Sequence, residues 1–295
     1  MDLDHFIIAT FCLVDDLMVD ILGHRCLRQR GPAPKLADSE VLTMEIVGEY
    51  LSLHQDKAIF DCLRRHYPHF FPALGQLHRT TFVRQAANLC HLKERMWQRL
   101  LPRIGCEPWL QLVDSFPLPV CQFARAHRCR CFGGEASFGY DVLLRQTFYG
   151  FRVHVLVAWP GVIVRFSLAP ANVHETAVVP ELVDGRQGIV VGDRNYWSPL
   201  LREALAPQGV QLQAPYQKAR QDPWPRRSAN LSRLRYRIDT VFGQLVDRYL
   251  IKHVRTRDLW HLGHRLLRKV LSHTIAFLLN QGQGHSPLQL SKLVT

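Results

Sequence analysis

The sequence lacks any long uninterrupted apolar stretch. No run of hydrophobic residues among its 295 reaches the roughly 18 that a membrane-spanning helix needs. It also lacks the basic start and small-residue cleavage site of a secretory signal, because the first charges are acidic and Asp15 and Asp16 interrupt the apolar run that follows. These absences predict a cytoplasmic protein with no membrane partner, in which the thiols stay reduced.

Several functional motifs are missing as well. The chain contains no G-x-x-x-x-G-K-[ST] phosphate loop, no G-x-G-x-x-G dinucleotide fingerprint and no G-x-S-x-G nucleophile elbow. The classes of protein that depend on these motifs therefore have no support. With 47% hydrophobic and 21% charged residues, the composition is that of a globular protein and excludes a disordered chain.

Acidic residues are scarce relative to basic ones. The chain has 37 Lys and Arg against 25 Asp and Glu, which gives a formal net charge of +12. Residues 216–273 alone carry 14 Lys and Arg against 4 Asp and Glu, so nearly the whole excess lies in this stretch. A concentrated basic surface indicates a polyanionic partner, here nucleic acid, whereas a merely solubilising surface is the alternative.

The eight cysteines fall into two groups. Five are scattered among apolar residues and resemble small core side chains, namely Cys12, Cys26, Cys62, Cys90 and Cys106. The other three, Cys121, Cys129 and Cys131, lie near His127 in CQFARAHRCRC. This group is a candidate zinc site, but its C-x-C spacing is tighter than the usual spacing of about two to four intervening residues. Both interpretations stay open.

The first hundred residues show the period of about 3.6 that is typical of amphipathic helices. Helices are predicted over residues 4–22, 38–51, 57–66 and 80–103. Together they predict an all-helical N-terminal domain over residues 1–105. This domain either binds DNA, dimerises or only covers the next domain, and the periodicity does not decide between these roles.

The pattern then changes to short apolar strands. Strands are predicted over residues 109–113, 148–158, 162–168, 188–191 and 210–214, and helices near His174 and over 199–205, 231–250 and 258–280. Residues 115–148 and 216–230 are expected to be irregular. This succession predicts an α/β domain over residues 106–250, followed by a basic helical segment, 251–295, that packs on the core of that domain.

Three aspartates are the candidates for chemistry. Asp114 and Asp193 each follow a buried strand, and Asp239 lies on a helix with an apolar face. A carboxylate at a buried strand end is costly unless it is paired or binds a metal, although each aspartate taken alone also suits a turn or a helix cap. Together with a basic surface, they indicate phosphoryl transfer with two divalent ions, Mg²⁺ or Mn²⁺, bound by hard oxygen ligands.

Other residues are candidates for binding DNA or for shaping the site. Arg235 precedes Asp239 by one helical turn, so it either holds a phosphate, orients a carboxylate or forms an i,i+4 ion pair. Arg152 and His154 share one strand face, which either contacts DNA or is solvated. The remaining candidates for phosphate contacts are Arg226, Arg227, Arg233, Arg237, Arg255, Arg257, Arg265, Arg268 and Lys269.

Two further pairs of residues have a structural and a functional interpretation. His174 and Glu175 open a helix, and a polar helix start is the simpler interpretation than a site role. Tyr196 and Trp197 follow Asp193. They either pack on the core, which we favour, or stack on a frayed base near the cleavage point.

The chain resembles the DDE-type transposases of bacterial insertion sequences, above all the insertion-sequence family numbered nine-eight-two. The resemblance covers nearly the whole chain. It is carried by ADSEVLTMEIVGEYL (37–51), VDSFPLPVC (113–121), TFYGFRVHVLVAWPGVIVRFSLAPANVHE (147–175), GDRNYWSP (192–199), RYRIDTVFGQL (235–245) and RKVLSHTIAFLL (268–279).

The resemblance implies a fold, an activity and a set of partners. The fold is an RNase H-like catalytic core, a mixed β-sheet with helices on both faces, after a helical N-terminal domain. The activity is hydrolysis of a phosphodiester at the element's ends, followed by attack of the freed 3′-hydroxyl on target DNA. The partners are double-stranded DNA, as terminal inverted repeats and as target, and a second copy of the chain in a homodimer on DNA, and the location is the cytoplasm in association with the nucleoid. The family's acids fall on Asp114, Asp193 and Asp239 of this sequence.

The third acid departs from the family pattern. The family has Glu where this chain has Asp239. Asp is one methylene shorter, a difference in reach of roughly 1.5 Å, and a misplacement of about 1 Å can cost about 100-fold in rate. The sequence therefore leaves two hypotheses, an active transposase or a transposase-derived DNA-binding protein with an impaired metal site. A general nuclease of the RNase H type is a third.

Overall fold

We analysed the chain with a computed structural model that describes residues 1–23, 25, 27–28, 31 and 33–295. The predicted core residue Cys26 lies outside the described residues. The chain divides into two compact units. The first unit consists of Met1–Ile104, Gln244–Val254 and Trp260–Thr295, and the second of Gly105–Gly243 and Arg255–Leu259. None of the helices among the described residues has the length and apolar character needed to cross a membrane.

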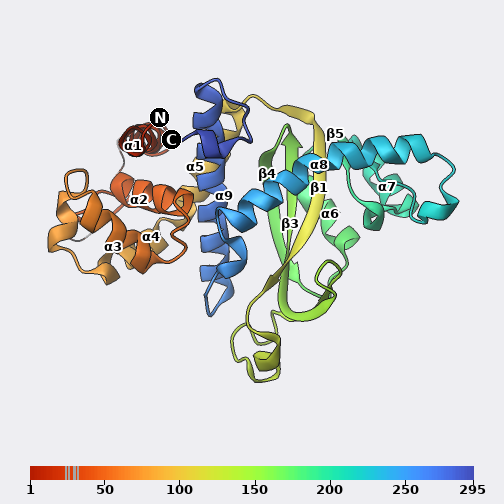
Figure 1. The fold of residues 1–295 in the computed structure, drawn as a ribbon, viewed down its shortest axis with the longest axis horizontal. Helices are drawn as coiled ribbons and strands as arrows, with labels where there is room; N and C mark the ends of the chain where they lie inside the picture. The colour runs from red at the N-terminus through yellow and green to blue at the C-terminus, as the bar shows by residue number, and fades with distance from the viewer. Residues whose placement is uncertain (24, 26, 29–30, 32) are drawn as a thin grey trace. The chain divides into compact units, whose positions relative to one another are not determined.

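The first unit is helical (Figure 1). Its helices are α1 (Leu3–Leu22), α2 (Asp38–Tyr50), α3 (Asp56–His66), α4 (Arg79–Asn88), α5 (Cys90–Leu100) and α9 (Leu259–Gly282), with 3-10 turns at Pro72–Gln76, Leu101–Arg103, Ile251–His253 and Leu290–Lys292. The predicted helices agree with these within two residues, except that the single helix predicted over 80–103 is two helices that meet at Leu89. No proline or glycine stands at Leu89, so no residue there signals the break.

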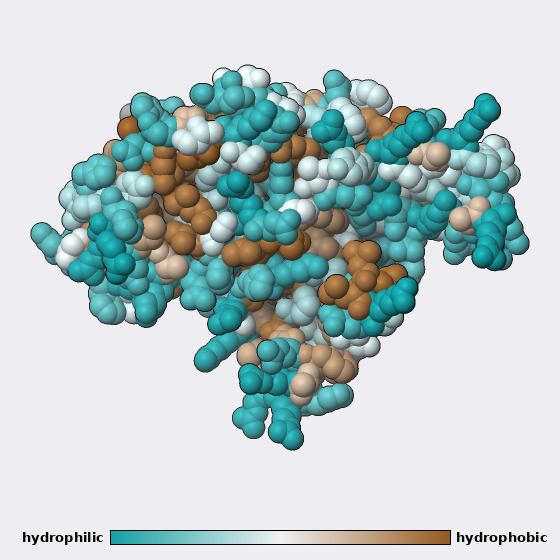
Figure 2. Space-filling view, viewed as in Figure 1, coloured by the Kyte–Doolittle hydropathy of each residue, from teal (hydrophilic) through white to brown (hydrophobic). Residues whose placement is uncertain are grey.

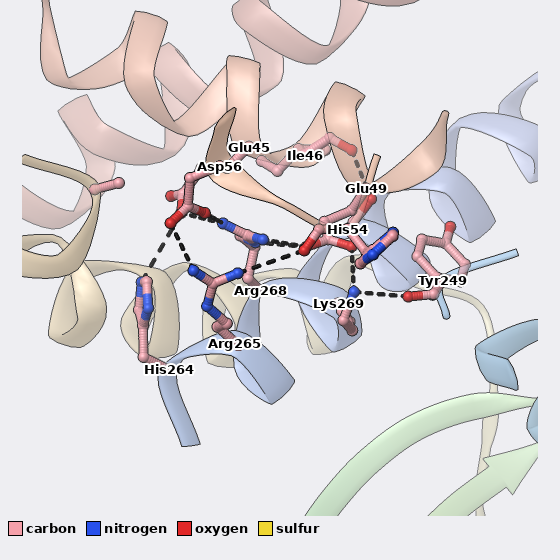
Figure 3. A network of polar contacts seen from close by, with 12 residues as sticks. Glu45, Ile46, Glu49, His54, Asp56, Tyr249, His264, Arg265, Arg268 and Lys269 are labelled. Carbon is pink, nitrogen blue, oxygen red and sulfur yellow. Dashed lines mark hydrogen bonds and ion pairs between the residues drawn. The ribbon is translucent and has the colours of Figure 1, made fainter. Parts of the chain in front are cut away.

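Helix α2 lies in the centre of the first unit, and 11 of its 13 residues are buried. Its two buried carboxylates, Glu45 and Glu49, face basic side chains of α9 (Figure 3). Lys269 Nζ donates to Glu49 Oε2 at 2.5 Å, and Arg268 Nε donates to Glu49 Oε1 at 2.6 Å. Arg268 also reaches Glu45 at 3.2 Å and Asp56 at 2.7 Å. Several bases therefore compensate these acids.

This network corrects two expectations. Lys269 and Arg268 are 1% exposed, and the Arg265 guanidinium is bound by Asp56 at 2.6 Å. Their charges neutralise buried carboxylates, so they are not available to DNA phosphates, and the DNA contact predicted for Lys269 is wrong. In addition, residues 260–295 belong to the same compact unit as residues 1–104, whereas the sequence predicted a separate C-terminal segment over 251–295. The acids of α2 supply the partners that the bases of α9 need.

The second unit contains a six-stranded mixed sheet. Its strands are β1 (Glu107–Pro119), β2 (Ser137–Asp141), β3 (Gln146–Trp159), β4 (Val162–Pro170), β5 (Gly188–Val191) and β6 (Val210–Gln213). The strand order is β2-β3-β1-β5-β6, and β4 pairs with β3. β3 is antiparallel to β1, β2 and β4, whereas β5 is parallel to both β1 and β6.

Helices cover both faces of this sheet. They are α6 (Glu175–Val183), α7 (Pro199–Leu205) and α8 (Pro225–Asp247), with 3-10 turns at Phe123–Arg128, Arg194–Tyr196, Ala206–Gln208 and Ala219–Gln221. Successive side chains of a strand point to opposite faces. Phe116 of β1 meets Phe242 of α8 edge-on at 4.9 Å, while its neighbour Ser115 meets Glu175 of α6 on the other face. The fold is thus an RNase H-like core, as expected.

Three predicted boundaries in the second unit are wrong. β1 extends to Pro119, well past the predicted 109–113, because residues up to Pro119 pair with β3. The parallel pairing of β1 with β5 stops at Leu112, so Pro117 and Pro119 lie where β1 has a neighbour on one side only. The stretch 115–148, expected to be irregular, contains β2, and α8 begins at Pro225 inside the loop predicted over 216–230. Proline suits a first helical position.

Candidate active site

The first two predicted acids lie at the same end of two neighbouring parallel strands. Leu110–Leu112 of β1 pair with Ile189–Val191 of β5. Asp114 comes two residues after the last paired residue of β1, and Asp193 comes two residues after the last residue of β5. Asp114 is thus inside β1, contrary to the prediction that it ends a strand, but it stands where the parallel pairing ends. This topology brings the two carboxylates together.

Arg235 of α8 joins these acids. Its Nη2 donates to Asp114 Oδ2 at 2.6 Å, and the backbone N–H of Ser115 donates to Asp114 Oδ1 at 2.8 Å. Asp193 Oδ1 accepts the backbone N–H of Asn195 at 2.8 Å. Of the three roles predicted for Arg235, the structure therefore supports orientation of a carboxylate. Its partner is Asp114, 121 residues away, not Asp239 one helical turn away.

The carboxylates hold more negative charge than Arg235 compensates. Burial raises the pKa of Asp114 to about 6, with the charge of Asp193 contributing and Arg235 opposing the rise. Burial also raises the pKa of Asp193, to which the charge of Glu175 contributes. The neighbouring Asp114 in turn raises the pKa of Arg235, although burial opposes this. Carboxylate oxygens are ligands that Mg²⁺ and Mn²⁺ prefer, so Asp114 and Asp193 fit a divalent cation that removes the excess charge.

The third predicted acid, Asp239, lies apart from this pair. It is exposed on α8, one turn after Arg235, and its charge contributes to the raised pKa of Arg235. In the described part of the chain, no three His, Cys, Asp or Glu side chains converge as ligands of one ion. The predicted set of three aspartate ligands is therefore not assembled in this arrangement, and Cys121, His127, Cys129 and Cys131 do not form the candidate zinc site.

Glu175 is a site residue that the sequence treated as a polar helix start. It is the first residue of α6, after the N-cap His174, so the predicted helix start is confirmed. Ser115 Oγ donates to Glu175 Oε1 at 2.7 Å, and Arg152 Nη1 donates to the same oxygen at 3.1 Å. No local pattern signals this contact, because Ser115 is 60 positions away. Glu175 adds a third carboxylate whose charge acts on Asp193.

The two strand residues predicted to contact DNA face α6 instead. Arg152 donates to Glu175, to Ser115 Oγ at 3.2 Å and to the Tyr140 carbonyl at 2.9 Å, so its guanidinium is held inside the unit. His154 is fully buried, and burial lowers its pKa to about 4. The predicted contact between His154 and DNA is therefore wrong, because a buried neutral imidazole does not reach a phosphate.

Tyr196 lies beside the carboxylates, in the turn that follows Asp193. Its side chain is 1% exposed, which agrees with the favoured packing role, and Trp197 packs edge-on against Tyr216 at 4.9 Å. The Tyr196 hydroxyl has no hydrogen-bond partner among the described residues. Burial raises its pKa well above the usual value, and the charges of Glu175, Asp114 and Asp193 add to this. The Tyr196 phenol thus stays protonated in its buried position beside the acids.

The basic residues of α8 divide between exposed and bound positions. Arg226 and Arg233 are exposed and share a helical face with Tyr236, and Arg255 and Arg257 are exposed as well. Arg227 donates to Gln213 Oε1, and the Arg237 guanidinium lies 5.2 Å from the centre of the Trp159 ring. Four of the predicted phosphate contacts therefore remain free to meet DNA.

Comparison with known proteins agrees with this geometry. Residues 105–259 match the family described as Transposase DDE domain. Among solved structures, the chain is similar to the piggyBac transposase in a synaptic complex with hairpin DNA, with a TM-score of 0.50 and 10% sequence identity. That match covers 99% of this chain and 78% of the piggyBac chain. No curated protein matches the chain.

The two matches carry different weight. At 10% identity, the likeness to the piggyBac transposase shows the fold alone. The family match covers more than half of the chain and includes Asp114, Asp193, Arg235 and Asp239. Domains of this family generally use divalent metal ions to act on DNA. The chain belongs to the DDE transposase domain family.

Proposed function

We propose that the chain is an active transposase of the bacterial insertion-sequence type. It hydrolyses a phosphodiester at each element end and then joins the freed 3′-hydroxyl to target DNA. The observation that carries the proposal is that Asp114 and Asp193 lie together where the parallel pairing of β1 and β5 ends, with Arg235 beside them and a pKa of about 6 at Asp114. Groups with a perturbed pKa that converge in this way are typical of functional sites.

The residues have separate roles in this proposal. Asp114 and Asp193, with Asp239, would hold a pair of divalent cations, Mg²⁺ or Mn²⁺. Such ions would supply Lewis-acid activation of the attacking oxygen and stabilisation of the leaving oxygen. Arg235 keeps Asp114 in place through its 2.6 Å hydrogen bond.

DNA binding is assigned to the exposed basic side chains. Arg226 and Arg233 on α8, with Arg255 and Arg257, contact the phosphates of double-stranded DNA at the inverted repeats and at the target. Phosphate contacts of this kind position the duplex without reading its sequence. Two element ends must be brought together for transposition, so we propose that the chain acts as a homodimer on DNA.

One observation favours a second candidate function. Asp239 is exposed, one methylene shorter than the family's Glu, and not joined to the other two acids. On this alternative, the chain binds the inverted repeats and acts by occupying them, without cleaving DNA.

The test is a cleavage assay on labelled duplex DNA that carries the sequences flanking the gene, with Mg²⁺ or Mn²⁺. We expect the native chain to cut at the element end, Asp114→Asn to bind with unchanged affinity but not to cut, and Asp247→Asn, an exposed acid at the end of α8, to cut normally. Cutting only by Asp239→Glu would favour the second candidate. Normal cutting by Asp114→Asn would contradict the proposed site.

A further inference from the structure

Three consecutive exposed apolar residues, among them the most exposed large apolar side chain of the described residues, Leu143, lie in the turn between β2 and β3. Val142, Leu143 and Leu144 are 71%, 92% and 62% exposed, and we call them the apolar tip. Figure 2 shows apolar side chains at the surface of the second unit among hydrophilic ones. Three consecutive exposed apolar residues are unfavourable in a soluble fold unless they serve a function. The apolar tip therefore requires an explanation that packing does not give.

The buried side chain of Asp141 holds the turn that carries the apolar tip in one conformation. The last paired residues of the two strands are Asp141 and Gln146. Asp141 is 6% exposed, and its Oδ1 accepts the backbone N–H of Leu143 at 3.0 Å and that of Leu144 at 3.2 Å. A carboxylate that binds two successive backbone donors holds a turn in one shape. The three apolar side chains are thus presented outward by an ordered turn.

The hairpin that carries the apolar tip is connected to the candidate active site. Arg152 donates through Nη2 to the carbonyl oxygen of Tyr140, at the end of β2, at 2.9 Å. Through Nη1 the same guanidinium donates to Glu175 and to Ser115, the neighbour of Asp114. The Arg152 side chain therefore links Glu175 and Ser115 to the end of β2. The end of β2, which leads into the apolar tip, therefore lies one arginine side chain away from the neighbour of Asp114.

The charges around the apolar tip favour DNA over a protein partner. Arg145 follows the tip directly, and Arg125, Arg128 and Arg130 precede Val142 by 12 to 17 positions in the sequence. All four arginines are exposed, and none forms an ion pair within the described residues. Of the two acids in this stretch, Asp141 is buried under the turn. Apolar side chains flanked by arginines are typical of segments that insert between base pairs while the cations contact phosphates.

We propose that Val142–Leu144 form a wedge that enters the DNA next to the cleaved phosphodiester and separates two stacked base pairs. The wedge would free the strand that carries the scissile phosphate, so that this phosphate reaches Asp114 and Asp193. Its ligand is double-stranded DNA at an element end. This inference rests on the proposed function and adds to it the means by which the duplex is opened.

The experiment uses the full chain and duplexes that carry the gene's flanking sequences, with 2-aminopurine at successive positions around the cleavage point and Ca²⁺ in place of Mg²⁺. The fluorescence of 2-aminopurine rises when the base loses its stacking partners. The test variant is V142S/L143S/L144S, and the matched control is Leu200→Ser on α7, an equally exposed leucine at 80%. All substituted side chains are exposed, so the unfolding midpoints stay unchanged.

We expect the native chain to raise the fluorescence at one or two adjacent positions and the triple variant to lose this rise. DNA affinity should fall on the order of tenfold in the triple variant, because serine no longer buries apolar surface against the bases, and Leu200→Ser should behave as native. An unchanged rise in the triple variant would overturn the inference.

Two further outcomes separate the inference from the proposed function. If the native chain cleaves its ends but raises the fluorescence nowhere, the wedge is wrong and the proposed function stands. If the native chain neither binds nor cleaves these DNAs, the proposed function itself fails. Sedimentation without DNA should give the same mass for the native chain and the triple variant. A dimer that the triple variant converts to a monomer would make the apolar tip a contact between copies and overturn the wedge.

Discussion

Buried carboxylates occur in both units, but their surroundings differ. In the first unit, Glu49 is bound by both Arg268 and Lys269, and Arg268 also reaches Glu45 and Asp56 (Figure 3). Lys93 Nζ adds a further contact to Glu45 at 2.5 Å. In the second unit, Asp114 has a single basic partner, Arg235, and a second carboxylate nearby, with a pKa of about 6.

The difference separates structural from functional charge. A buried acid with several basic partners stabilises the packing of helices and has no capacity left for a ligand. A buried acid with too few partners destabilises the fold until a cation arrives, which is the state expected of a metal site before loading. A buried carboxylate therefore does not by itself indicate a functional site. A buried carboxylate with too little positive charge around it does.

The largest effect is expected from a substitution in the buried ion-pair network of the first unit. Glu49→Gln removes the carboxylate that holds Arg268 and Lys269 and leaves buried cations without compensation. We expect the free energy of unfolding of the first unit to fall by about 3–5 kcal/mol. Urea unfolding measures this, with the exposed Glu94→Gln on α5 as control, for which a change below about 0.5 kcal/mol is expected. Similar losses in both variants would show that the network contributes no more than an exposed acid.

In the second unit, removal of a buried carboxylate is expected to raise the stability of the fold. Asp114→Asn removes a charge whose pKa is raised from 3.8 to about 6, which corresponds to roughly 3 kcal/mol. Because the folded state binds the proton more tightly than the unfolded state, the native carboxylate destabilises the fold above pH 6 and not below about pH 4. The variant should therefore be more stable than the native chain at pH 8.

The measurement is thermal unfolding of the two chains between pH 4 and pH 8 without divalent ions. The stability gained by Asp114→Asn should shrink as the pH falls through about 6 and vanish near 4. A variant that is less stable than the native chain at pH 8 would contradict the view that Asp114 is undercompensated.

A smaller effect is expected from Glu175. Its charge helps to raise the pKa of Asp193, so Glu175→Gln should let Asp193 ionise at a lower pH. Since ionised carboxylates are needed to bind cations, the acid limb of the pH–rate profile for cleavage should move to lower pH by less than about one unit. Glu181→Gln, an exposed residue of the same helix, is the control. A shift to higher pH in Glu175→Gln would refute the assigned coupling.

Local patterns in the sequence were enough to predict most of the elements. The apolar periods of α1, α3 and α9 and the apolar run of β5 are confirmed. Long-range pairing could not be predicted: β1 is extended beyond residue 113 only because β3 lies beside it, and β2 exists because it pairs with the start of β3. These contacts join segments that no local period relates.

The candidate site was predicted in part for the same reason. Asp114 and Asp193 stand out because each follows an apolar strand. The bond from Arg235 to Asp114 and the position of Glu175 depend on the order of strands and helices, which short patterns do not encode. Lys269 looked like a phosphate contact because the sequence shows its charge and not its burial. The apolar tip lay in a stretch expected to be irregular.

The central claim is that the uncompensated carboxylates of the second unit bind a divalent cation. Its most direct test is a Mn²⁺ titration of the native chain, Asp114→Asn and Glu94→Gln, followed by calorimetry and by the melting temperature. We predict saturable binding and a rise of several degrees in the native chain and in Glu94→Gln, and at least about tenfold weaker binding in Asp114→Asn. Equal binding by all three chains, or none by the native chain, would contradict the account.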